Sequence, residues 1–170
     1  MPNLSALTAA MVQLNCGDTA HTYHFLQVYA FAKAIGEDEK LDARTQEILE
    51  VAALTHDIGI RPAMLRFGHQ NGKLQEQVGP PVARSLLKGL GYDEALIDRV
   101  CWLIAHHHTF DPIGGIDHQI LVEADFLVNL NGKSRQSVQN VRDTIFKTRL
   151  GLRMLDSLFC QPNPLEGIGQ

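Results

Sequence analysis

Cysteine is scarce in this sequence, and the three that occur, Cys16, Cys101 and Cys160, are far apart. An odd number without any CxxC pair supports neither a disulfide framework nor a zinc site built from thiolates. Long apolar runs are also missing: none approaches the ~20 residues that a membrane-spanning helix requires. The N-terminus has no basic run ahead of its apolar residues, so it predicts an amphipathic first helix and not a signal peptide.

An excess of positive charge is likewise absent. The formal net charge is -4, which gives no electrostatic reason to expect nucleic acid or an anionic membrane as a partner. An anionic substrate would have to be attracted by a local cation, and a bound metal ion would serve. We therefore expect a cytoplasmic protein that acts on a small molecule. The composition leaves a homo-oligomer open.

Strand patterns are almost missing, whereas helical periodicity recurs along the chain. The 170 residues, 45% of them hydrophobic, are enough for one domain with a full core. The sequence therefore predicts a single all-α domain, a helical bundle, over residues 1–170. After the first helix, we expect helices at about 18–35, 42–56, 80–91, 93–108, 117–131, 134–146 and 148–159. We expect a loop at 61–73 with room for one short helical turn.

Ionisable residues interrupt the apolar faces of these helices, and their burial is costly unless each is paired or bound to a metal. His24 shares a helical face with Val28 and Phe31, which follow it in the next two turns. Taken alone, such a residue is more often a partly buried histidine of the core than a metal ligand. His21, one turn earlier, is a rival for the same role.

The pair His56-Asp57 ends a strongly apolar helix. An imidazolium at a helix C-terminus is favourable but a carboxylate there is not, and a bound cation would remove that conflict. Asp125 lies in mid-helix on an apolar stripe with Leu121 and Val128, where its helix propensity is poor and its burial costly. An arginine or histidine could pair with it, but a metal-binding role is favoured.

Three consecutive histidines, His106, His107 and His108, form the densest cluster. Consecutive helical residues are about 100° apart, so only one or two of these can face a common centre. The remainder would stabilise the helix end or lie in solvent. Imidazoles and carboxylates together suit a first-row divalent ion: Fe, Mn, Co, Ni or Zn.

The order His24, His56-Asp57, Asp125 resembles the H…HD…D signature of the HD superfamily of metal-dependent phosphohydrolases. HFLQV is similar to the first motif of that family, and AALTHDIG to its doublet motif. The resemblance covers about residues 18–131, with C-terminal helices at about 134–159. It implies an HD-type helical domain whose metal is held by His24, His56, Asp57 and Asp125. It also implies hydrolysis of a nucleotide or other small phosphate ester by a metal-activated water.

Some branches of this superfamily bind two or three ions, and these share a further histidine that lies four residues before a glycine. Here Gln75 stands four residues before Gly79, with Glu76 beside it. A second ion would need Asp57 as a bridge, together with His107, His108 and the Gln75–Glu76 pair. Glutamine is a poorer donor than imidazole for these ions, so we expect one tight ion and leave a second, weaker one open.

For catalysis we expect Asp57 to orient the attacking water or to bridge to a second ion, and a histidine of the 106–108 run to act as an acid. His107 or His108 would protonate the leaving oxygen, since imidazole titrates near neutral pH. Three basic side chains are candidates for binding phosphate oxygens, and the sequence does not choose among them: Arg61, Lys73 and Arg84.

Two other functions are weighed against this one. A non-catalytic module that binds a metal or ligand would keep the same ligand set. A di-iron oxygenase, a minority chemistry in this superfamily, would resemble the same site with a fuller set of histidines, and Gln75 argues against it. Related signalling phosphodiesterases usually have a lysine just after the doublet motif, where this chain has Ile60 followed by Arg61. That replacement argues against cyclic-dinucleotide activity.

Overall fold

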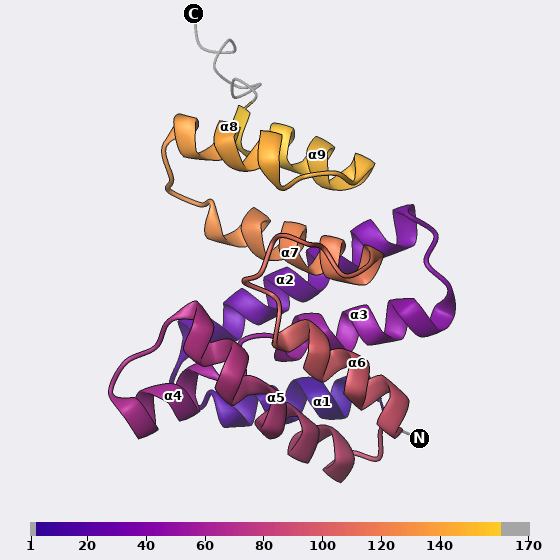
Figure 1. The fold of residues 1–170 in the computed structure, drawn as a ribbon, viewed down its shortest axis with the longest axis vertical. Helices are drawn as coiled ribbons and strands as arrows, with labels where there is room; N and C mark the ends of the chain where they lie inside the picture. Colours follow the sequence, from indigo (N-terminus) through magenta and orange to yellow (C-terminus); the bar gives the residue numbers. More distant parts are fainter. Residues whose placement is uncertain (1–2, 161–170) are drawn as a thin grey trace, which may run out of the picture.

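The computed structural model describes residues 3–160, and over this range the chain is helical with no strand (Figure 1). This confirms the all-α prediction. A π-helical turn, Asp156–Cys160, follows the last α-helix. The α-helices are α1 (Leu4–Leu14), α2 (Thr19–Asp38), α3 (Ala43–Thr55), α4 (Ile60–Phe67), α5 (Gly72–Gly89), α6 (Glu94–Ile104), α7 (Ile116–Asn129), α8 (Arg135–Thr144) and α9 (Arg149–Leu155).

The core lies where α2, α3, α6 and α7 pack together. Helix α2 packs against α3 and α7, while α5 packs against α6, and α9 covers the other side of α7 (Figure 1). The fully buried residues are mostly aliphatic, as burial of apolar surface requires. They include Phe25, Val28, Leu49, Leu54, Leu96, Ile104, Ile120 and Leu121.

Most helices begin at a polar residue whose side chain accepts a hydrogen bond from a free backbone N–H of the first turn, the usual N-cap arrangement. The caps at Asp18, Asp42 and Asp93 confirm three predicted helix starts. The capping residues are Asn3, Asp18, Asp42, Asn71, Asp93, Ser134 and Thr148.

The predicted loop at 61–73 is wrong, because the chain there forms α4 and the start of α5. Pro62 lies in the first turn of α4, where its missing N–H costs no helical hydrogen bond. Gly68 ends α4 in the left-handed conformation, with φ 74°. Asn71 then caps α5 through a bond from the N–H of Leu74. The glycines and Pro62 thus lie at helix ends and do not prevent helix formation. Helix α5 begins at Gly72, ahead of the predicted start at 80, so Pro80 and Pro81 lie inside it.

Helix α2 is longer than predicted, since it runs through Gly36 and ends at Asp38. A Cβ at position 36 would collide with the side chains of Gln46 and Leu49 on α3. Gly36 therefore allows two helices to approach closely, which explains why a residue that often ends helices lies inside this one.

Glu123 fixes α9 to α7. Its side chain is fully buried and accepts hydrogen bonds from the backbone N–H groups of Lys147 and Thr148, at 2.6 and 2.9 Å. The Thr148 hydroxyl and the Gln119 amide donate to the same carboxylate. Because these donors surround Glu123, a buried charge is stabilised at the N-terminus of α9.

We expect Glu123→Ala to lower the free energy of unfolding by about 3 kcal/mol, because several buried donors lose their acceptor. Urea denaturation monitored by circular dichroism measures this. Glu94→Ala is the control: Glu94 is exposed and pairs with Arg84 and Lys88, so its loss should cost less than about 1 kcal/mol. Equal midpoints for the two variants would contradict the role of Glu123.

Candidate metal centre

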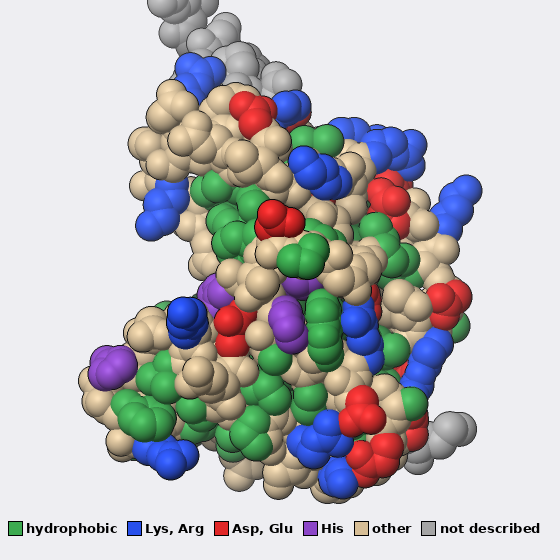
Figure 2. Space-filling view, in the orientation of Figure 1, with side chains coloured by type: hydrophobic (Ala, Val, Ile, Leu, Met, Phe, Trp, Pro, Cys, Tyr) green, Lys and Arg blue, Asp and Glu red, His purple; other side chains and the backbone are tan. Residues whose placement is uncertain are grey.

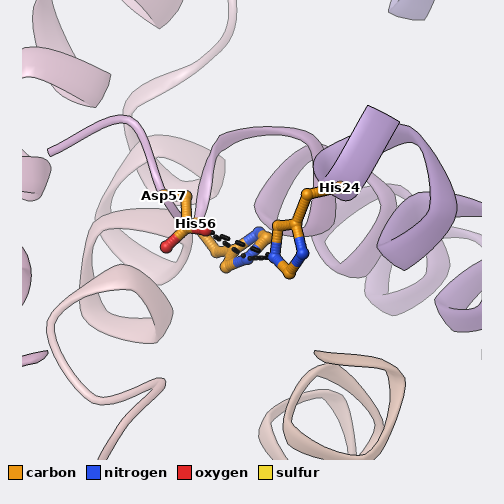
Figure 3. A group of neighbouring side chains, drawn as sticks. All are labelled: His24, His56 and Asp57. Atoms are coloured by element: carbon orange, nitrogen blue, oxygen red, sulfur yellow. Dashed lines mark hydrogen bonds and ion pairs between the residues drawn. The ribbon is translucent and has the colours of Figure 1, made fainter. Parts of the chain in front are cut away.

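Four side chains meet where α2, α3 and α7 converge: His24 from α2, His56 and Asp57 from the end of α3, and Asp125 from α7. His24 Nε2 lies 3.1 Å from Asp125 Oδ1 and 3.3 Å from Asp57 Oδ2. His56 Nε2 lies 3.3 Å from the same Asp57 oxygen and 3.5 Å from Asp125 Oδ1. Figure 3 shows His24, His56 and Asp57 pointing toward one another. The structure thus brings together the four residues that the sequence motif singled out.

Nε2 of His24 is only 3.1 Å from Nε2 of His56. The ring of His56 donates its Nδ1–H to the carbonyl oxygen of Ala53, at 2.9 Å, and the residue is fully buried. This backbone bond sets the tautomer and leaves the Nε2 lone pair directed at the centre, as in histidines that ligate metals.

Opposite charges hold the centre together when it carries protons. Burial lowers the pKa of His24, but hydrogen bonds to Asp125 and Asp57 raise it by more, from 6.5 to about 9. Burial also opposes charge on Asp57, yet the charge of His56 and three imidazole contacts hold the pKa of its carboxyl well below the usual range. A divalent cation fits this donor set, because it would replace the protons and pair with both carboxylates.

A second group of donors shares Asp57. Asp57, His107 and His108 each offer one ligand atom, and these atoms lie within 4.8 Å of one another. Asp57 Oδ1 is 3.6 Å from Nε2 of His107, whereas Oδ2 faces His24 and His56. The two oxygens of one carboxylate therefore face the two groups, as the bridging arrangement in the sequence hypothesis requires.

His107 carries the clearest sign that this second group binds something. Its Nδ1–H is donated to the carbonyl oxygen of Ile104, at 2.7 Å. Its Nε2 is buried and has no hydrogen-bond partner among the described residues. A buried lone pair without a partner is costly, and a cation beside Asp57 would satisfy it.

The remaining members of the histidine run have different surroundings. His106 stacks on Trp102, with ring centroids 4.1 Å apart, and donates Nδ1–H to the Trp102 carbonyl, so it belongs to another cluster. His108 hydrogen bonds through Nε2 to the Gln75 side-chain oxygen, at 2.9 Å. Glu76 accepts from the backbone N–H of His108 and is engaged there. Gln75 thus reaches the second group only through His108.

An open cavity of about 370 Å³ lies against the centre. Figure 2 shows histidine and acidic side chains at the surface where this face of the molecule is hollowed. We call this space the metal-side cavity. It is lined by Ala20, His21, His24, Asp57, Ile60, Gln70, Gln75, His108, Asp125 and Asn129.

Sequence reasoning missed Gln70 and Asn129 in this lining. Asn129 follows Asp125 by four residues on α7, and residues at that spacing share a helical face. That periodicity was a usable signal. Gln70 precedes the Asn71 cap in a segment read as a loop, and its proximity to Gln75 comes from the turn between α4 and α5.

The three basic residues suggested for phosphate binding lie outside this lining. Arg84 is paired with Glu94 and Asp98, at 3.1 and 2.6 Å. Lys73 is exposed on the first turn of α5. Arg61 donates to the carbonyl oxygen of Leu14, at 2.7 Å, and lines a neighbouring cavity. None of the three lies at the metal-side cavity.

Fold and centre together define a helical protein whose histidines and aspartates gather in a candidate divalent-metal site. The sequence matches the HD domain family over residues 22–147, and the chain belongs to this family. This confirms the resemblance drawn from its motifs. No curated protein matches the chain.

A solved structure gives a second comparison. The chain is similar to the crystal structure of a predicted HD superfamily hydrolase from an uncultured Thermotogales bacterium, with a TM-score of 0.67 and 26% sequence identity. The similarity covers 92% of this chain and 84% of that one. In the described part of the chain no helix combines the length and the apolar character needed to cross a membrane.

We expect His24→Ala, Asp57→Ala and Asp125→Ala each to lose most of the bound metal while remaining helical, since each removes one ligand atom. Metal analysis after dialysis against Mn²⁺, with circular dichroism, measures both properties. His21→Ala should keep its metal, because His21 is not among the atoms that converge on the centre. Full occupancy in Asp57→Ala would refute the ligand assignment.

A second, weaker class of metal sites is expected in calorimetric titration with Mn²⁺. His107→Ala should remove that class and preserve the tight one, because His107 Nε2 lies near Asp57 Oδ1 and not near the Asp57 oxygen that faces His24 and His56. His69→Ala is the matched control, an exposed histidine outside the metal-side cavity. A single class in the wild-type protein, or loss of the tight class in His107→Ala, would contradict the assignment of two groups.

Proposed function

We propose that this protein is a metal-dependent phosphohydrolase that acts on a nucleotide or another small phosphate ester. The observation that carries the proposal is the sharing of Asp57 by two donor groups at the edge of an open cavity. A buried, saturated ligand set would favour a structural metal, whereas open access is typical of catalytic sites.

A metal ion supplies, when bound, the Lewis acidity that activates water and neutralises phosphate charge. The lining of the metal-side cavity contains no lysine or arginine among its described residues. Phosphate oxygens would therefore be met by hydrogen bonds from the chain, with Gln70, Gln75 and Asn129 as the neutral donors. The scarcity of cationic side chains favours a single phosphate group over a longer polyphosphate.

The carboxylates of the centre have a second task. Asp57 and Asp125 line the cavity with acceptor oxygens, and such oxygens can orient an attacking water by accepting its hydrogen bonds. Burial and the neighbouring His107 lower the pKa of His108. His108 is therefore neutral near pH 7, and its hydrogen bond to Gln75 holds the ring in place.

The comparisons support the class of reaction and not the substrate. The similar solved structure is described as a predicted hydrolase, and its similarity extends over most of both chains. Against a purely non-catalytic module stands the open access to both donor groups. Against a di-iron oxygenase stands Gln75, a neutral amide beside the second group where a further imidazole ligand would be needed.

We expect the purified protein to release phosphate from a nucleoside monophosphate or a small phosphomonoester with Mn²⁺, Co²⁺, Ni²⁺ or Fe²⁺, and to stop when a chelator is added. Asp57→Asn should lower kcat/KM by about 100-fold or more, because it removes the shared carboxylate charge. Glu94→Gln, far from the centre, serves as control. No turnover across a broad panel of esters with all four metals would favour the binding-module alternative.

A further inference from the structure

A second carboxylate–histidine pair lies beside the metal centre and takes no part in it. His21 Nδ1 is 2.5 Å from Asp18 Oδ2, and the other oxygen of Asp18 accepts the backbone N–H of His21, at 3.0 Å. Nε2 of His21 has no partner among the described residues. With a side-chain exposure of 33%, this ring is fixed on one side and accessible on the other.

His21 lies at the junction of two cavities. It lines the metal-side cavity, and it also lines an adjoining one of about 500 Å³, which we call the outer cavity. Ile60 and Gln70 line both as well, so the two cavities adjoin at these side chains. The outer cavity combines polar and apolar side chains, among them Asn15, Asp18, Arg61 and Met64.

The pair is fixed relative to the metal centre by a single helix. Asp18 is the N-cap of α2, and His21 and His24 follow on that helix three residues apart. Residues at this spacing are neighbours on one helical face. His21 is therefore held one turn from a metal-binding histidine, and the cap that starts the helix also orients the ring.

From this geometry we propose that His21, oriented by Asp18, is the acid that protonates the leaving group of the ester, and that the outer cavity holds that leaving group. The inference rests on the proposed phosphohydrolase function. The ligand class is a phosphate monoester whose alcohol part carries hydrogen-bonding groups for Asn15, Gln70 and Arg61 and an apolar surface for Ile60 and Met64.

The step balances without a further reactant. Water adds to phosphorus and releases one proton to solvent, the bond from phosphorus to the leaving oxygen breaks, and its electron pair stays on that oxygen. The proton on His21 Nε2 moves to the same oxygen, so a neutral alcohol departs. His21 then recovers a proton from solvent, while Asp18 retains its hydrogen bond to Nδ1–H throughout, as the orienting carboxylate of a catalytic histidine does.

The histidines first suggested for this role have other partners. His107 is buried and its Nε2 faces Asp57, within the second donor group. His108 donates Nε2–H to Gln75. Among the histidines that the structure describes, His21 lines both cavities and has a ring nitrogen, Nε2, without a hydrogen-bond partner. An alkoxide leaving group is strongly basic and needs such a proton to depart as a neutral alcohol, whereas the phenolate of an acidic phenol leaves without it.

The dependence on leaving group tests this directly. His21→Gln with Mn²⁺ is compared with wild type on glycerol phosphate, an alkyl ester, and on p-nitrophenyl phosphate, whose phenol is acidic. We expect kcat to fall about 100-fold or more on the alkyl ester. The fold-loss on the phenyl ester should be smaller by a factor of at least about ten. His69→Gln is the matched control, and metal content is measured for every variant.

Each outcome of this comparison decides a different point. Equal losses on both esters with full metal content would overturn the acid role, and so would no loss on either. Loss of metal from His21→Gln would make His21 a ligand and also overturn it. If the wild-type protein turns over none of the esters, the proposed phosphohydrolase function is refuted, and with it the acid role of His21. This outcome differs from the others because it appears in the wild-type protein, before any variant is compared.

The variant Asp18→Asn tests whether Asp18 orients His21, while His21 itself remains in place as the proposed acid. Removing the carboxylate takes away the group that orients the ring, so kcat on glycerol phosphate should fall while kcat on p-nitrophenyl phosphate changes much less. The other charged or titratable groups that line the two cavities are Cys16, His24, Asp57, Arg61, His108 and Asp125, and all remain in this variant. An unchanged kcat on glycerol phosphate would overturn the role of Asp18.

A readout independent of activity completes the test. In metal-free protein with ¹⁵N-labelled histidine, neutral His21 should carry its proton on Nδ1, where Asp18 accepts it. Asp18→Asn should lose this preference, since an amide can also donate to the ring. A wild-type His21 with its proton on Nε2 at high pH would show that Asp18 does not set the tautomer, and would overturn the pair.

Discussion

The structure depends on one costly arrangement, the burial of two imidazoles and two carboxylates at a single point between three helices. Nitrogen and oxygen atoms from His24, His56, Asp57 and Asp125 converge to between 3.1 and 3.5 Å. Like groups this close repel unless protons or a cation lie among them. The surrounding aliphatic core supplies the free energy that offsets this cost, because α2, α3 and α7 bury apolar faces on either side of the centre.

One type of backbone hydrogen bond orients two of the histidines. His56 and His107 each lie just after the end of a helix, α3 and α6, and each donates Nδ1–H to the carbonyl of the residue three positions earlier. A carbonyl near a helix end needs such a donor. The bond therefore serves the helix and the site together: it satisfies the backbone, selects the tautomer, and turns Nε2 toward Asp57. The shared carboxylate then links two helix ends that are distant in sequence.

The helix that bears His24 couples the centre to the adjoining cavity. Its N-cap, Asp18, satisfies the first turn and at the same time holds His21. Arg61, at the start of α4, donates to the carbonyls of Leu14 and Cys16, and so ties the chain before α2 to α4. The wall of the outer cavity is thereby built from contacts that are structural in themselves. Its shape therefore follows from how these helices begin.

The sequence by itself determined the all-helical class, the helix starts at polar caps, and the four residues of the first donor group. Periodicity, capping chemistry and the order of a motif are local properties, so no tertiary contact was needed to recognise them. Tertiary structure alone decided that His106 stacks on Trp102 while His107 faces Asp57. It also decided that Arg84 forms ion pairs with Glu94 and Asp98. The reason is that the direction of a side chain in the turn after a helix, and the partner of a long basic side chain, depend on residues far away in sequence. Helix α4 and the start of α5 were missed for a related reason, since glycine and proline signal a boundary without saying whether a helix stands on either side.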